Sequence, residues 1–134
     1  MDCIFCKIAK GEIPSHKVYE DENFIAFLDI NPFEKGHTLL IPKKHAKWVW
    51  DLEEKEYLKL MNIVKKIARA LQKRFNTEWI VSGVVGMDIP HAHVHIIPRF
   101  IGDGLGSFPS KILDPKPINE EMKEIAEGIK REVG

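Results

Sequence analysis

The segment from His91 to Ile96 constrains the fold most, because histidines alternate with apolar residues in His-Ala-His-Val-His-Ile. Such alternation is typical of a β-strand, in which residues i, i+2 and i+4 share one face at a spacing of about 6.6 Å. We therefore predict a strand over residues 92–100. On this strand Ala92, Val94 and Ile96 would face the core. The imidazoles of His91, His93 and His95 would line up on the opposite face. Each imidazole needs a hydrogen-bond partner, a metal or an anion, because burying an unpaired polar group is costly.

Three interpretations of this histidine row remain open from the residues alone. A catalytic zinc ion commonly takes three protein ligands and a water molecule. Alternatively, one neutral imidazole is a nucleophile, and its neighbours orient it and neutralise a phosphate. The third interpretation is a hydrogen-bonded ladder of histidines without a function.

The pair Cys3-x-x-Cys6 bears on this choice. Two thiolates at this spacing can bind one zinc ion, although a redox pair has the same form. A closed structural zinc site needs two further ligands, and the candidates are His16, His37, His45 and one member of the histidine row. If one histidine of the row is a structural ligand, the other two suit phosphate chemistry better than a second metal.

The rest of the chain predicts an α+β domain that combines helices with an antiparallel sheet. Apolar residues recur at steps of three and four from Glu53 to Phe75, which predicts one long amphipathic helix. Three β-rich runs predict further strands: Val18–Phe27, Thr38–Ile41 and Trp79–Val85. The first two resemble a hairpin with a long connection. Asn119–Val133 predicts a terminal helix that Gly128 weakens, and residues 102–117 are expected to be mostly irregular.

Length and charge exclude several classes of function. The 134 residues suffice for one domain, and we expect a single domain over 1–134. Because 20 Lys and Arg balance 20 Asp and Glu, the chain lacks the basic excess that binds nucleic acid. No apolar run approaches the roughly 20 residues of a membrane span, and no signal-peptide pattern opens the chain. We expect a cytoplasmic, thiol-reducing location.

The histidine row resembles the signature of the histidine triad family, in which hydrophobic residues alternate with three histidines and two more follow. The resemblance covers about residues 2–104, and its Cys-x-x-Cys pair looks like that of the Hint-like branch. Other segments resemble the family in the expected order: Cys3–Ile8, Gly11–Pro14, Phe27–Pro32, Gly36–His45 and Ile97–Arg99. It implies a HIT-like fold with about five antiparallel strands, one long helix, and an extension over 105–134 that holds the C-terminal helix.

The resemblance also implies a nucleotide hydrolase or transferase that attacks an α-phosphate. His93 matches the nucleophile that forms a nucleotidyl-imidazole intermediate, and His95 would hydrogen-bond the phosphate region. His37 would orient the triad. One structural zinc ion per chain would be held by Cys3, Cys6, His45 and His91, which would join the N-terminal segment to the catalytic strand.

The resemblance places a purine nucleoside between apolar side chains, with Asp29 accepting hydrogen bonds from the ribose hydroxyls. The apolar walls would be Phe5, Ile8, Ile13, Phe27 and Ile30. The chain departs from the family at Met87 and Asp88, where many members carry Gln and then Ser or Thr. Asp88 would either handle a proton for the leaving group or fix the loop whose N–H groups meet the phosphate. A simple turn aspartate is the alternative.

The favoured substrate is a purine nucleoside 5′-phosphoramidate, with a dinucleoside polyphosphate as the second candidate. The resemblance further implies a homodimer with residues 79–85 near its two-fold axis. Two other functions remain open. A nucleotide-binding regulator would keep the pocket without turnover, and a metal-dependent hydrolase would use all three triad histidines as ligands.

Overall fold

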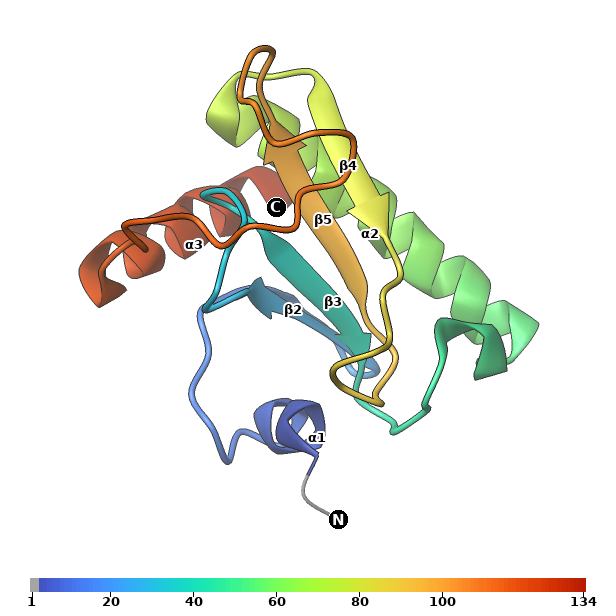
Figure 1. The fold of residues 1–134 in the computed structure, drawn as a ribbon. Coiled ribbons are helices and arrows are strands. Elements are labelled where there is room, and N and C mark those ends of the chain that lie inside the picture. The colour runs from blue at the N-terminus through green and yellow to red at the C-terminus, as the bar shows by residue number, and fades with distance from the viewer. Residues whose placement is uncertain (1–2) are drawn as a thin grey trace.

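A five-stranded antiparallel sheet forms the centre of the computed structural model, which describes residues 3–134 (Figure 1). The strand order β1-β2-β3-β5-β4 places β5 between β3 and the edge strand β4. The strands are β1 (Lys17–Glu20), β2 (Phe24–Leu28), β3 (Thr38–Pro42), β4 (Trp79–Gly83) and β5 (Val94–Arg99). The expected α+β fold with about five antiparallel strands is confirmed.

The predicted single strand over Val18–Phe27 is wrong, because the chain turns back on itself within it. Oδ1 of Asp21 accepts hydrogen bonds from the backbone N–H groups of Asn23 and Phe24, each at 2.8 Å, and this local turn separates β1 from β2. The two strands then pair antiparallel. The predicted pairing with Thr38–Ile41 is confirmed, since β2 and β3 are antiparallel neighbours joined by a long connection.

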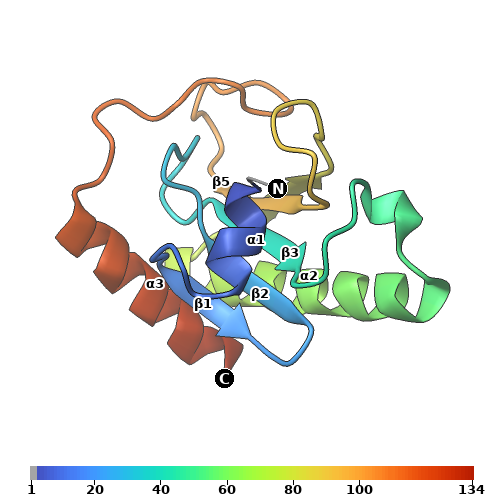
Figure 2. The same cartoon turned by 90° about the horizontal axis from the view of Figure 1, so that it is seen from below.

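Two long helices cover one face of the sheet, α2 (Glu54–Phe75) and α3 (Asn119–Val133) (Figure 2). Most of the predicted apolar stripe of α2 packs into this core, although Met61 is 39% exposed. Gly128 does not break α3. A Cβ atom at that position would collide with the side chain of Arg74 on α2, so the glycine allows the two helices to approach closely. No helix in residues 3–134 is both long and apolar enough to cross a membrane.

The opposite face of the sheet carries α1 (Ile4–Ala9), a six-residue helix that the sequence patterns did not predict. Helices this short are unstable alone and depend on tertiary contacts. Here Phe5 and Ile8 are buried against the sheet, in a cluster with Ile25, Phe27, Leu39 and Ile41. Cys3 caps the helix, because its Sγ accepts the N–H of Cys6 at 3.4 Å.

The segment between β5 and α3 is irregular, as predicted, and it crosses the same face of the sheet as α1 (Figures 1 and 2). Its first turn is held by a bidentate pair between Arg99 and Asp103, with N···O distances of 2.8 and 2.9 Å. Further along, the N–H of Leu113 donates to the carbonyl of Pro32 at 2.7 Å. These contacts hold residues 107–113 on this face of the sheet, where the ring of Phe108 lies near His95 on β5.

Candidate active site

The three histidines of the row have three different environments. β5 begins only at Val94, so His91 and His93 precede the strand and the predicted start at residue 92 is too early. The N–H of Ala92 donates to the carbonyl of Ala46 at 2.7 Å instead of joining the ladder with β3. The alternation itself is confirmed: Ala92, Val94 and Ile96 are buried in the core beneath α2.

His91 belongs to a cluster of four sulfur and nitrogen atoms on the N-terminal side of the site. Its Nδ1 lies 3.3 Å from Sγ of Cys3, 3.4 Å from Sγ of Cys6 and 3.2 Å from Nδ1 of His45. Sγ of Cys6 lies 3.2 Å from the same His45 nitrogen. The ligand atoms of a tetrahedral zinc site with two sulfurs and two nitrogens stand about 3.3–3.8 Å apart.

The protonation of His91 suits this cluster. Its Nε2 lies 2.9 Å from the carbonyl oxygen of Pro42, so Nε2 carries the proton and the lone pair of Nδ1 faces the thiols. Burial lowers the pKa of His91 and keeps the ring neutral. The residues therefore fit a zinc ion: two thiols, a fixed imidazole lone pair and a second imidazole, all within 4.8 Å of one another.

His93 is held so that one ring nitrogen is free for chemistry. Its Nδ1 lies 2.7 Å from the backbone carbonyl oxygen of His91, which requires Nδ1 to be the donor. Nε2 therefore carries a lone pair, and the side chain lines the central cavity. The ring of Phe5 packs edge-on against this imidazole, with 5.1 Å between the ring centroids.

His95 is oriented by His37 of the loop before β3. The backbone N–H of Phe33 donates to Nδ1 of His37 at 3.0 Å, so the proton of this ring resides on Nε2. That nitrogen lies 2.9 Å from Nδ1 of His95 and donates to it. The proton of His95 is consequently on its own Nε2, and His95 presents a hydrogen-bond donor to the cavity that it lines.

Burial keeps both rings of this pair neutral. Burial, and then His95, lower the pKa of His37 to about 3. Burial, and then His93, lower the pKa of His95 to about 4, whereas Asp88 opposes this shift. Burial raises the pKa of Asp29, against the opposing effects of the Asn31 N–H and His93.

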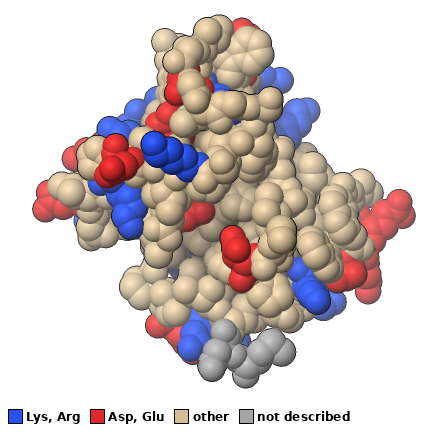
Figure 3. All heavy atoms as spheres, in the orientation of Figure 1, with Lys and Arg blue, Asp and Glu red and all other residues tan. Residues whose placement is uncertain are grey.

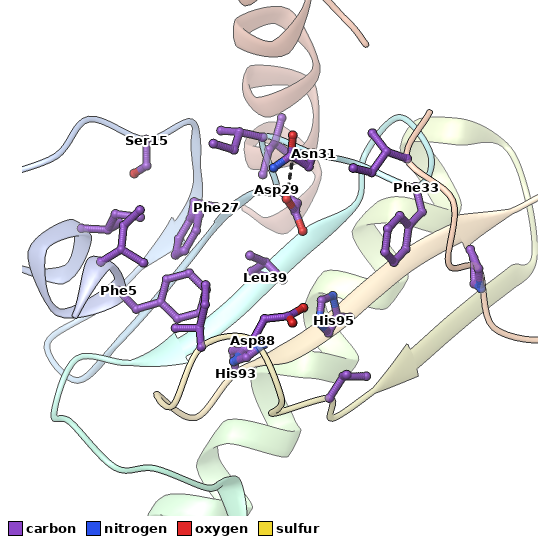
Figure 4. Close-up of a pocket in the computed structure, with 18 of the residues that line it drawn as sticks. Phe5, Ser15, Phe27, Asp29, Asn31, Phe33, Leu39, Asp88, His93 and His95 are labelled. Atoms are coloured by element: carbon purple, nitrogen blue, oxygen red, sulfur yellow. Dashed lines mark hydrogen bonds between the residues drawn. The ribbon is translucent and has the colours of Figure 1, made fainter. Parts of the chain in front are cut away.

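A cavity of about 680 Å³ lies over the sheet between α1 and residues 107–113, and Figure 3 shows it as a hollow with mostly uncharged walls. In Figure 4, Phe5 and Phe27 lie on one side of the cavity and His95 and Phe33 on the other. Every residue predicted to bind the nucleoside or the leaving group lines it: Phe5, Ile8, Ile13, Phe27, Asp29, Ile30 and Asp88.

Asp29 also plays the alternative role of a turn residue, because its Oδ1 accepts the N–H of Asn31 at 2.8 Å. Its Oδ2 lies 3.6 Å from Nε2 of His37. One carboxylate oxygen therefore fixes the turn while the residue lines the cavity.

Several lining residues were missed by the sequence analysis. Phe33, Phe108 and Ile112 come from irregular segments without a periodic pattern, and the ring of Phe108 stands 6.4 Å from that of His95, centroid to centroid. Ser15 also lines the cavity, and its buried Oγ has no hydrogen-bond partner among the described residues.

Comparison with known proteins identifies the family. The HIT domain model matches residues 10–102. The chain belongs to the HIT family. A HIT-like protein from Borreliella burgdorferi is 46% identical over 114 residues, which is 78% of this chain and 81% of the relative. Adenosine 5′-monophosphoramidase from Schizosaccharomyces pombe is 38% identical over 134 residues, covering 97% of this chain and 100% of the yeast protein.

Two solved structures share nearly the whole architecture of this chain. A zinc-bound histidine triad family protein from Mycobacterium smegmatis superimposes with a TM-score of 0.84 at 30% identity, covering 99% of this chain and 94% of that chain. A histidine triad nucleotide-binding protein from Sulfolobus tokodaii gives a TM-score of 0.85 at 32% identity, with coverage of 98% and 91%. The resemblance seen in the sequence is thus confirmed for family and fold.

Proposed function

We propose that this HIT protein hydrolyses purine nucleoside 5′-phosphoramidates through a covalent nucleotidyl-His93 intermediate. The observation that carries the proposal is the 2.7 Å hydrogen bond between Nδ1 of His93 and the His91 carbonyl, which leaves Nε2 as the free nitrogen of a side chain that lines the cavity. A neutral imidazole held in this way is a ready nucleophile. Two relatives named adenosine 5′-monophosphoramidase support the choice of a P–N bond, at 38% identity in fission yeast and 39% in Saccharomyces cerevisiae.

The reaction proceeds in two displacements at the α-phosphorus. In the first, Nε2 of His93 forms a bond to phosphorus, the P–N bond to the leaving amine breaks, and the amine departs with a proton taken from bulk water, which the attacking water molecule of the second step returns. In the second, water attacks the phosphorus, the bond to Nε2 breaks, and the nucleoside monophosphate leaves with neutral His93 restored. In sum, one water molecule is consumed, its hydroxyl ends on phosphorus and its proton on the amine.

The other residues of the site bind and orient the substrate. His95 donates its Nε2–H to a phosphate oxygen on which charge develops, and His37 keeps that proton in place. The base lies between the apolar side chains of α1 and β2, while Asp29 accepts from the ribose hydroxyls. Because His37 and His95 stay neutral well below neutral pH, this arrangement persists in the physiological range.

A structural zinc ion, one per chain, completes the proposal. Cys3, Cys6, His45 and His91 would hold it, and the cation would stabilise both thiolates. The cluster joins α1 to the segment that carries His93, so it fixes the nucleoside wall relative to the nucleophile. Both cysteines are free thiols, which suits a reducing, cytoplasmic location.

We further propose that the protein is a homodimer that pairs through β4. This strand is an edge of the sheet, so one side of its backbone has no partner strand among the described residues. Trp79 on β4 is 50% exposed, and Leu58 and Met61 on the neighbouring helix α2 are 60% and 39% exposed. Val81→Lys, near the middle of β4, is expected to yield monomers in light scattering.

The alternative of a hydrolase with a triad-bound metal has less support. Ligand atoms of His91 gather with Cys3, Cys6 and His45, whereas those of His95 gather with Asp29 and His37; within residues 3–134, His93 joins neither group. A nucleotide-binding regulator without turnover remains the second candidate. Met87 stands where many members carry Gln; its side chain has no amide to offer the phosphate and is 90% exposed.

Intact-mass analysis after rapid quenching tests the proposal. The protein is mixed with adenosine 5′-phosphoramidate, and the wild type is compared with His93→Ala and His93→Gly while zinc is counted in each sample. We expect an adenylyl adduct in the wild type only, with equal zinc in all three proteins. Bound nucleotide without adduct or turnover in the wild type would favour the regulator, and loss of activity on chelation with the fold intact would favour metal catalysis.

A further inference from the structure

The half of the cavity that the nucleoside would not fill receives the leaving group. Its charged lining is unusual for a site that binds an anionic substrate. None of the described residues that line the cavity is Lys or Arg, although the proposed substrate is an anion. The charged side chains among them are two carboxylates, Asp29 and Asp88. Asp29 lies on the nucleoside side, where its Oδ1 accepts a hydrogen bond from the backbone N–H of Asn31.

Asp88 lies directly beside the reacting centre, between His93 and His95 in Figure 4. It comes from the loop between β4 and β5 and lines the cavity together with His93 and His95, as Figure 4 shows. Its negative charge acts on His95: it raises the pKa of that residue and so partly offsets the lowering by burial. Lys116, which donates to Oδ1 of Asn31 at 3.1 Å, is a cation near the rim, but Asn31 lies across the cavity from Asp88.

The remaining wall of this half is mostly apolar, although Ser110 also lines the cavity. Phe108 packs towards His95, and Phe33 packs on His37, with 4.9 Å between ring centroids. Val85 also lines the cavity. A polyphosphate leaving group would bring several negative charges beside Asp88 without a lining cation to neutralise them. An amine with an alkyl chain and a second positive charge would instead match both the apolar walls and the carboxylate.

We propose that Asp88 makes the leaving-group half of this cavity selective for amines that carry a second positive charge and unfavourable for polyphosphates. This inference rests on the proposed phosphoramidase function and names its class of substrate. Asp88 is a specificity residue here because its carboxylate faces the departing group. It favours a cationic group both in the bound substrate and as the P–N bond breaks and the amine gains positive charge.

The size of the effect follows from exposure. Asp88 is exposed, and exposed charge pairs interact only weakly. We therefore expect about a threefold change in kcat/KM per unit of leaving-group charge, or roughly tenfold from an anionic to a cationic amine. High salt should reduce this ratio, because solvent-exposed charges are screened.

The test uses three adenosine 5′-phosphoramidates with leaving amines of equal length: diaminopropane, butylamine and β-alanine. The wild type should prefer them in the order cationic, neutral, anionic. Asp88→Asn should bring the three kcat/KM values together, and Asp88→Lys should reverse the order. Glu12→Gln is the matched control, because it removes the same charge from an exposed residue that does not line the cavity, and it should keep the wild-type order.

Two outcomes separate this inference from the function on which it rests. If the wild type hydrolyses all three substrates with the same kcat/KM, or if Asp88→Asn keeps the wild-type ratios, the selectivity is not due to Asp88 and the inference is overturned. If no substrate yields AMP or an adenylyl adduct, the proposed function itself fails.

Discussion

Lowering the pH should destabilise this protein through its buried histidine pair. A histidine whose pKa is lower in the folded state binds fewer protons there, so its stabilising contribution is complete above its unfolded pKa and is lost as the pH falls. For His37 and His95 the unfolded value is 6.5, and the folded values are about 3 and about 4. Going from about pH 8 to about pH 5 should therefore cost about 2 kcal/mol for each residue.

Urea unfolding followed by the fluorescence of the three tryptophans measures this loss at both pH values. Because other groups also titrate, the decisive comparison is with His37→Gln. Glutamine can accept the N–H of Phe33 and donate to His95, but it does not titrate. The variant should lose about 2 kcal/mol less than the wild type over the same pH interval.

His16→Gln is the matched control, because His16 lies near the surface, where its Nε2 is 3.0 Å from Oδ1 of Asn119. It removes one histidine without touching the buried pair and should keep the wild-type difference between the two pH values. If His37→Gln and the wild type lose equal stability, the neutral, hydrogen-bonded state of this pair is wrong, and with it the assigned proton on His95.

Three further predictions follow from single residues. Cys6→Ser should lower the melting temperature by about 5–10 °C in zinc, and a difference that persists after both proteins are stripped of metal would contradict the metal site. Ser15→Ala should stabilise the free protein by about 1 kcal/mol, because it removes a buried hydroxyl that has no partner among the described residues. It should weaken AMP binding about fivefold in calorimetry, because the bound nucleotide would form a hydrogen bond with that hydroxyl; unchanged affinity would place Ser15 outside the site. Gly36→Ala should cost about 2–3 kcal/mol in urea, since φ is +90° and the new Cβ would lie 2.5 Å from Phe75, whereas Gly102→Ala, with φ +82° and open space, should cost about 1 kcal/mol. Equal losses in the two glycine variants would show that contact with the aromatic ring is unimportant.

Much of the fold could be predicted because its signals are local. Apolar residues at every second position placed Ala92, Val94 and Ile96 in the core. Apolar residues at a period near 3.6 did the same for most of the apolar face of α2. Prediction failed at two places, for two different reasons. Asp21 closes a turn within an otherwise β-rich run, and α1 is too short to reveal itself by periodicity.

The sequence by itself determined which residue types are available and which face of each element they occupy; the resemblance to histidine triad proteins added the expected grouping. The tertiary structure decided the chemistry of each ring. His91, His93 and His95 are adjacent in the row, yet their protons are placed by Pro42, by the His91 carbonyl and by Phe33 through His37. Those partners come from separate segments, and hydrogen bonding depends on ångström-scale positions that only the packed sheet sets. Local periodicity cannot encode such distances, so the tautomers and the wall formed by Phe108 appear only in the folded chain.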